Sequence, residues 1–193
     1  MEYQLAHQKY SDEIFAIETE RLRLSVYRAG ALKKVSDYVI RNRDFHKRFS
    51  QPHDDSYFTL KEQRRYMDSD IKAFKRGDLI PLWITLKEDH EHILGRVSFF
   101  NIAMGGMMLA QIGYHLDEQS CGNGYMTEAV KGACAMMFDI MKLHRIEAFI
   151  LPENKKSIDL IQRAGFIHEG LRYSYMNIDG RYRDHETFYL LNT

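Results

Sequence analysis

The chain has 193 residues, 45% of them hydrophobic, and its 27 Lys and Arg side chains balance 27 Asp and Glu side chains. Its length suits one domain with a core of its own, and a net charge of zero excludes a general field that would attract nucleic acid or an anionic membrane. Two cysteines, Cys121 and Cys134, are too few for a secreted disulfide scaffold, and neither a signal peptide nor an apolar run of ~20 residues is found. We expect a single cytoplasmic domain over 1–193, with 1–18 as an N-terminal extension.

In chain order, the first half of the sequence predicts a short leading helix within residues 1–18, then a strand, then two helices. Leu22, Leu24 and Val26 alternate with polar residues, which is typical of a half-buried strand. Apolar residues at helical spacing after Gly30 predict one amphipathic helix, and a second is expected between residues 59 and 77.

The second half of the chain predicts six further strands and two further helices. A helix is expected from about residue 125 to 141 and another over 154–163. The strands are expected at residues 80–86, 93–101, 107–116, 145–151, 171–178 and 182–191. The fold class is therefore α/β (α+β), with a mixed, mostly antiparallel sheet of about seven strands flanked by helices.

Between the strand that ends near Leu116 and the helix that follows lies the glycine-containing stretch 119–129. Gly122 and Gly124 can adopt positive φ and bring bare backbone against a ligand. Successive N–H groups in such a loop converge on one point, and the positive end of the next helix adds to them. The expected ligand is a phosphate.

The pattern Q-x-x-G-x-G from Gln119 to Gly124 resembles the acetyl-coenzyme A pyrophosphate loop of the GNAT superfamily of N-acetyltransferases. A dinucleotide fingerprint would have a third glycine where Thr127 stands, and a P-loop would have a lysine where Tyr125 stands. Further segments are similar, in order, to the ribosomal-protein alanine N-acetyltransferases, at residues 19–24, 93–95, 112–114, 143–148, 152–157, 165–170 and 179–184.

This resemblance implies the GNAT acyl-CoA N-acyltransferase fold, with acetyl-coenzyme A as cosubstrate. In that fold the strands expected at 107–116 and 145–151 splay apart after a bulge, and the pantetheine arm enters the gap between them. Asn154 resembles an asparagine that binds this arm, although it could simply cap a helix. The implied cofactor-binding residues are Ile112, Tyr114, His115, Leu116, Gln119, Ser120, Cys121, Gly122, Asn123, Gly124, Tyr125, Met126, Thr127, Asn154, Lys156 and Ser157.

The catalytic groups of the family are only partly present. Many relatives have a tyrosine that protonates the leaving thiolate, and Ile161 stands at that position here. The ribosomal-protein branch instead uses a serine as this acid, and Ser157 stands at the matching position. Relatives use a glutamate as the general base at one of two positions, which are occupied here by Phe149 and Met176. The remaining base candidates are therefore Glu147 and His115. Both could instead be structural polar residues, with Glu147 bonded to a neighbouring arginine.

The missing base favours one class of acceptor. A peptide α-amine titrates near ~8 and is partly neutral at cytosolic pH, whereas a lysine amine titrates near ~10.4. We therefore expect direct acetyl transfer to a primary amine, favouring a protein N-terminal α-amine such as that of a ribosomal protein. The alternatives are a small-molecule amine acetyltransferase and a coenzyme A-binding protein without catalysis.

Other partners and sites follow from single features. The resemblance implies that aromatic and polar residues between the first two helices and in the last hairpin bind the acceptor, with His46 and Tyr175 among the candidates. Asp184, in an Asp-His pair of that hairpin, is expected to brace it. His90 and His92 lack metal-ligand spacing, so no metal is expected. The protein is expected to be a monomer or a homodimer.

Overall fold

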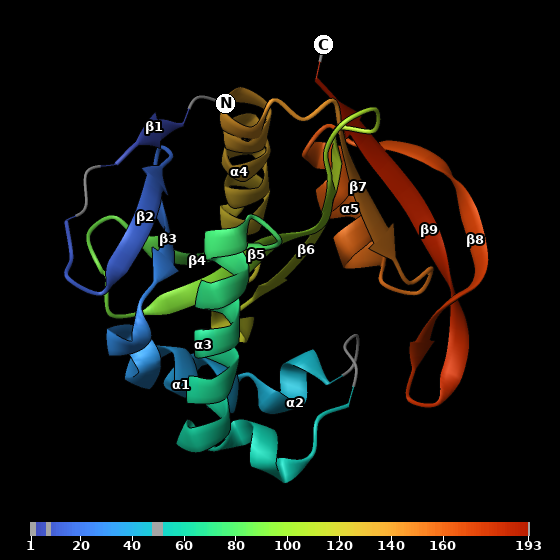
Figure 1. Ribbon diagram of the computed structural model, residues 1–193. Helices are drawn as coiled ribbons and strands as arrows, with labels where there is room; N and C mark the ends of the chain where they lie inside the picture. The colour runs from blue at the N-terminus through green and yellow to red at the C-terminus, as the bar shows by residue number, and fades with distance from the viewer. Residues whose placement is uncertain (1–2, 7–8, 48–51, 193) are drawn as a thin grey trace.

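The computed structural model describes residues 3–6, 9–47 and 52–192, and within them nine strands form one sheet in the order β1-β2-β3-β4-β5-β6-β7-β9-β8 (Figure 1). Neighbouring strands run antiparallel except β6 and β7, which are parallel. The strands are β1 (Gln4–Leu5), β2 (Glu13–Glu18), β3 (Leu22–Tyr27), β4 (Ile80–Leu86), β5 (Ile93–Ala103), β6 (Leu109–Leu116), β7 (Arg145–Ile150), β8 (Ile167–Ile178) and β9 (Arg181–Leu191). The predicted mixed, mostly antiparallel sheet is confirmed.

Helices cover the two faces of the sheet. One face packs against α1 (Leu32–Arg41) and α3 (Leu60–Arg76), which are linked through the short α2 (Arg43–His46), and the other packs against α4 (Tyr125–Met141) and α5 (Lys155–Arg163). We call these the α1–α3 face and the α4–α5 face. Single 3₁₀ turns occur at Ala29–Ala31 (η1), Asp55–Phe58 (η2) and Glu118–Ser120 (η3).

The leading helix predicted within residues 1–18 is wrong, and so is the count of seven strands. The segment instead contributes β1 and β2 to one edge of the sheet. Glu13 of β2 is buried against β3, where it accepts hydrogen bonds from Arg23 at 2.6 Å and from the Ser25 hydroxyl at 2.6 Å. A buried carboxylate needs such partners. The pairing joins residues ten and more positions apart, so the local hydrophobic pattern could not reveal it.

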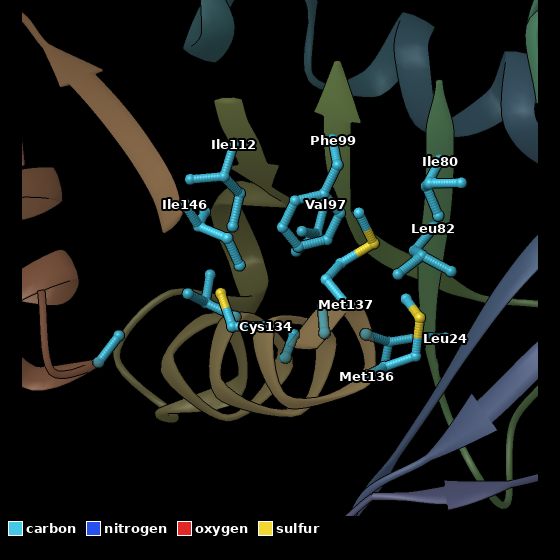
Figure 2. Packing of buried hydrophobic residues seen from close by; sticks show 14 of the residues in the cluster. Leu24, Ile80, Leu82, Val97, Phe99, Ile112, Cys134, Met136, Met137 and Ile146 are labelled. Atoms are coloured by element: carbon cyan, nitrogen blue, oxygen red, sulfur yellow. The ribbon is translucent and has the colours of Figure 1, made fainter. Parts of the chain in front are cut away.

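The hydrophobic core lies on both faces of the sheet. The larger cluster fills the α4–α5 face, and Figure 2 shows Cys134, Met136 and Met137 of α4 packed beneath side chains of the central strands. Ile161 belongs to this cluster and is 0% exposed. A smaller cluster on the α1–α3 face includes Tyr38. Ile161 therefore has a packing role, which accounts for an apolar residue at that position.

The sheet opens between β6 and β7. Only three residue pairs join these strands, ending at Gln111 and Glu147, and beyond them the two strands diverge (Figure 1). Over its remaining length β6 stays paired with β5, and β7 stays paired with β9. The expected splay is present. The nearby bulge lies in β5, where Asn101 has a φ of 49° and the register shifts between Phe100 and Ala103.

Candidate functional site

The open edge of β6 carries backbone groups that have no strand beside them. The Asp117 N–H donates to the Leu94 carbonyl at 2.6 Å, and strand alternation then directs the N–H and C=O groups of Ile112, Tyr114 and Leu116 away from β5, toward the gap. The Leu116 carbonyl accepts a hydrogen bond from His46 Nε2 at 2.8 Å. Ile112 and Tyr114 are thus placed to pair with an extended ligand that contains amides.

The loop after β6, residues 117–127, which we call the glycine loop, leads directly into α4. Gly122 has a φ of 86° and Gly124 a φ of 76°, the left-handed conformations that the sequence predicts. No side chain caps α4, and the Glu128 N–H donates to the Gly124 carbonyl at 3.1 Å. The N–H groups of the three preceding residues have no intrahelical acceptor. They lie at the positive end of a 17-residue helix, an arrangement that suits an anion.

The predicted members of this loop have different environments. The chain from Cys121 to Gly124 is exposed, as is Gln119, and all can meet a ligand. Two members face inward instead. Ser120 donates its hydroxyl hydrogen bond to Asp117 at 3.3 Å, and Met126 packs in the core. Their contribution to ligand binding would therefore be through backbone groups alone.

One end of the glycine loop is held by residues that sequence reasoning did not assign to the site. Arg21, in the turn just before β3, donates through Nε to Glu128 of α4 at 2.7 Å and through a terminal nitrogen to the Asn123 carbonyl at 3.1 Å. The Thr19 hydroxyl also donates to Glu128, at 2.7 Å. Beside this contact a Cβ on Gly132 would lie 2.4 Å from Thr19 Cγ2, so with threonine at position 19 the close packing of α4 on the β2–β3 turn requires a glycine there.

The other end of the glycine loop is held by α1. Arg41 and Asn42 both donate to Asp117 Oδ1, at 2.8 and 2.7 Å, and Asn42 accepts the Glu118 N–H at 3.0 Å. Burial opposes ionisation of Asp117, but the hydrogen bonds from Asn42 and Arg41 outweigh it and lower its pKa. Near the opposite end, Arg21 and Arg163 line a pocket of about 420 Å³ that also touches Gly124 and Thr127. The loop is therefore fixed in position and bordered by cationic groups.

A pair of hydroxyl groups bridges the gap on the α4–α5 face. Asn154 caps α5, accepting the Ser157 N–H at 3.2 Å, and the Ser157 hydroxyl lies 2.8 Å from the Tyr114 hydroxyl. Burial raises the pKa of Tyr114 to about 12, so this hydroxyl keeps its proton at neutral pH. Sequence reasoning assigned Tyr114 to the site but missed its contact with Ser157. Lys156 is exposed beside them, on the side of Cys121.

Glu147, one of the two predicted base candidates, lies at the apex of the gap and is bound to arginine. It is 8% exposed, and Arg145 donates to it at 2.7 Å while also contacting Glu169 at 2.5 Å. This contact is the structural alternative that the sequence suggested for Glu147. The Glu147 carboxylate is therefore held by Arg145.

His115, the other base candidate, lies on the α1–α3 face in what we call the histidine cluster: Tyr38, His46 and His115. The Tyr38 hydroxyl is 2.6 Å from His115 Nδ1, and the two imidazole rings are 5.0 Å apart between centroids. Burial, with smaller electrostatic contributions from His46 and Arg96, holds the pKa of His115 well below its usual range. Burial also lowers the pKa of His46. Both rings are therefore neutral at pH 7.

The last hairpin provides the facing wall of the gap. The register of β8 against β9 shifts between Arg172 and Met176, and within this bulge Ser174 has a φ of 48°. Its N–H donates to Asp184 at 2.7 Å, so Asp184 braces the hairpin as predicted. The bulge also places Tyr175 4.7 Å from the Phe149 ring of β7. Bulges commonly re-aim side chains in this way beside ligand sites.

Two other kinds of site can be reported for the described part of the chain. No group of three or more His, Cys, Asp or Glu side chains there is placed to hold a metal ion. None of the helices described is both long enough and apolar enough to cross a membrane.

Comparison with known proteins gives consistent matches. The acetyltransferase (GNAT) domain family matches residues 21–167. A probable N-acetyltransferase of Bacillus subtilis, YjcK, is 36% identical over 151 residues, covering 78% of this chain and 83% of the relative. The ribosomal protein uS5-alanine N-acetyltransferase of Escherichia coli is 30% identical over 169 residues, covering 88% and 87%. The crystal structure of a ribosomal-protein-S5-alanine acetyltransferase from Vibrio fischeri superposes with a TM-score of 0.84 at 26% identity, covering 92% of this chain and 96% of that one.

Proposed function

The chain belongs to the GNAT family of acetyltransferases, and from this membership we propose that it transfers the acetyl group of acetyl-coenzyme A to the N-terminal α-amine of a protein. A ribosomal-protein N-terminus that begins with alanine is the proposed acceptor, by similarity to the uS5-alanine N-acetyltransferase. Such an acceptor would be met in the cytoplasm.

The donor half of the proposal is supported by the glycine loop and the open edge of β6. The loop offers backbone N–H groups at the start of α4, which suit a pyrophosphate. The edge offers the backbone of Ile112 and Tyr114, which suits the two amides of a pantetheine arm. These two features are adjacent along the chain, so one extended molecule could occupy both.

Ser157 is proposed to supply the proton that the leaving thiolate needs. The neutral amine nitrogen bonds to the acetyl carbon, the carbon–sulfur bond breaks, and the thiolate takes the Ser157 proton. The acylated nitrogen releases its surplus proton, which returns to the serine oxygen through water. Tyr114 can donate its own hydrogen bond to the Ser157 oxygen, which leaves the serine O–H to point at the sulfur. The amine must lose its proton before attack. Glu147 is held by Arg145, and burial lowers the pKa of His115, which opposes proton uptake by its ring.

One observation carries the choice of an α-amine: three carboxylates, Glu147 on β7, Glu169 on β8 and Asp70 on α3, are each held by an arginine. Arg145 contacts Glu147 and Glu169, and Arg96 contacts Asp70 at 2.8 Å. A polyamine or a lysine side chain is drawn by free carboxylates and requires a strong base, because its amine titrates near ~10.4. An α-amine that titrates near ~8 is already partly neutral.

The test is a thiol-release assay with purified protein, acetyl-coenzyme A and matched acceptors. One peptide begins with a free alanine and contains no lysine, and its partner has an acetylated N-terminus and one internal lysine. Spermidine represents the small amines. We expect kcat/KM to be highest for the free N-terminus, and mass spectrometry of fragments to place the acetyl group on its α-nitrogen. Preferred turnover of the lysine peptide or spermidine would refute the acceptor assignment, and binding without turnover of any amine would refute the reaction.

A further inference from the structure

His115 has a hydrogen-bonding arrangement that the general reaction does not explain. Its Nδ1 is 2.6 Å from the Tyr38 hydroxyl, and Tyr38 is 0% exposed. Among the described residues this is the hydrogen bond that Tyr38 makes through its side chain. The ring of His115 therefore has one nitrogen committed to a buried phenol.

The direction of this hydrogen bond follows from the cost of the alternative. If Nδ1 carried the proton and donated to Tyr38, the phenol O–H would be buried with no acceptor, an arrangement that proteins avoid. If Tyr38 donates instead, Nδ1 accepts, and the neutral ring carries its proton on Nε2. Burial raises the pKa of Tyr38 well above its usual value, so the phenol keeps the proton that it donates.

The second ring nitrogen is open to a ligand. No described residue contacts His115 Nε2 by a hydrogen bond, and Nε2 is not among the buried polar atoms that lack a partner. It therefore reaches solvent. The groups around the ring are His46 from α2, Trp83 from β4 and Arg96 from β5, and none of them is an acceptor for Nε2–H at hydrogen-bond distance.

The position of the ring selects the acceptor, not the acyl donor, as its ligand. On the α4–α5 face the gap is bridged by the Tyr114 and Ser157 hydroxyls and backed by the core. The α1–α3 face is the other side of the open edge of β6. His115 stands on this face, and its contact with Tyr38 draws the ring toward α1 and out of the plane of the sheet.

We propose that His115 serves as a neutral hydrogen-bond donor whose Nε2–H binds a backbone carbonyl oxygen of the acceptor peptide, and that Tyr38 is the positioning residue that fixes this tautomer. The inference rests on the proposed function and narrows it, because an N-terminal residue has a carbonyl next to its amine and a polyamine has none. It also removes His115 as the base. The lone pair of the neutral ring is on Nδ1 and is already occupied by Tyr38.

The tautomer can be tested without any acceptor. Long-range proton–nitrogen NMR spectra of protein labelled with ¹⁵N-histidine distinguish a protonated ring nitrogen from an unprotonated one. We expect His115 to carry its proton on Nε2 from pH 6 to 9. In Tyr38→Phe the spectral pattern of this tautomer should change, because Nδ1 no longer accepts a hydrogen bond from the phenol. A proton on Nδ1 in the wild type would overturn the proposal, because Nε2 would then be a basic acceptor.

The carbonyl contact is tested by matched variants and matched acceptors. Glutamine can place an N–H near the position of Nε2, whereas alanine cannot, so His115→Ala should lower kcat/KM for an alanine-starting peptide by roughly tenfold and His115→Gln should restore most of it. Isopropylamine lacks the carbonyl, and its turnover should be nearly the same in both variants. His144→Gln, at an exposed histidine outside the site, is the control.

The outcomes separate this inference from the proposed function. If wild type acetylates no N-terminal peptide, the proposed function fails and the carbonyl contact falls with it, while the NMR experiment still decides the tautomer. If peptides are acetylated but His115→Gln is as impaired as His115→Ala, and a limb of the wild-type pH profile disappears in both, His115 is the base and the inference is wrong. An equal loss on isopropylamine would likewise exclude the carbonyl contact.

Discussion

The glycine loop and the histidine cluster lie at the two sides of the same strand end, and they are stabilised by opposite electrostatic means. The loop is held by two ion pairs, one between Arg41 and Asp117 and one between Arg21 and Glu128. The cluster is held by hydrogen bonds of neutral side chains: Tyr38 bonds to His115, and His46 bonds to the Leu116 carbonyl. Cationic groups next to helix N–H groups suit a phosphate, whereas neutral donors suit an uncharged polar acceptor. The difference indicates which substrate each region can bind.

The largest expected effect concerns the Tyr114–Ser157 hydroxyl pair at the gap between β6 and β7. Ser157→Ala should lower kcat by ~10²–10⁴-fold, because a proton donor contributes about that much, while the dissociation constant of acetyl-coenzyme A stays nearly constant. Tyr114→Phe should have a smaller effect, since it removes only the support of Ser157. Stopped-flow thiol release and calorimetry measure the two quantities.

Asp159→Asn, on the exposed side of the same helix, is the control for that experiment. Turnover within a few-fold of wild type in Ser157→Ala would mean that the serine only caps and packs, and that water protonates the thiolate.

The next effect isolates the glycine loop. Gly122→Asp should weaken coenzyme A binding by about 10–100-fold, because it places a β-carbon at positive φ and a negative charge beside the phosphates. Nothing lies within 4 Å of the added Cβ, so the fold should survive. Gly105→Asp has the same kind of φ and equally open surroundings in the β5–β6 turn, which makes it a matched control. Equal affinities of the two variants in calorimetry would refute the phosphate assignment.

Acid should destabilise the two regions in different pH windows. The pKa of His115 is lowered by folding, so the unfolded chain takes up the proton more readily and stability falls as pH drops below about 6.5. Asp117 and Glu128 also have lowered pKa values, but as carboxyls they lose their stabilising contribution only as pH falls below about 4. Urea unfolding at pH 7.5, 5.5 and 3.5 should show both stages.

His115→Gln should reduce the first stage of that loss and leave the second unchanged. His144→Gln should reduce neither. A first stage of equal size in both variants would show that His115 titrates normally in the folded protein.

The smallest effect tests the far wall of the gap. Asp184→Ala removes the acceptor of the Ser174 N–H and should cost about 1 kcal/mol, or a Tm decrease of ~2–4 °C. Asp184→Asn keeps an acceptor oxygen and should retain most of the stability. We expect KM for the peptide to rise in Asp184→Ala while coenzyme A affinity is unchanged. A loss of coenzyme A affinity would mean that the hairpin also supports the donor side.

The elements with strong local signals were predictable from the sequence, and the contacts between distant residues were not. The glycines of the loop, the cap at Asn154 and most strands follow from spacing and from backbone preference. Nothing local indicates that Glu13 pairs with Arg23, and this pairing turns the first segment into strands. The same limit applies to the site. Tyr38 lies 77 positions from His115, and Arg21 lies 107 positions from Glu128, so only the folded sheet brings these partners together.

The close contact between Thr19 and Gly132 constrains how this sequence can evolve. Gly132→Ala alone would push a methyl group into Thr19 Cγ2 at 2.4 Å, and Thr19→Ala alone would remove the hydroxyl that binds Glu128. Thr19→Ser deletes the obstructing carbon and keeps that hydroxyl, so Gly132→Ala can follow it without the clash and without loss of the hydrogen bond to Glu128. Position 19 should therefore change before position 132 among descendants of this protein. A library that randomises position 132 alone should yield few folded variants with alanine there, whereas one that randomises both positions should yield the pair of serine at 19 and alanine at 132.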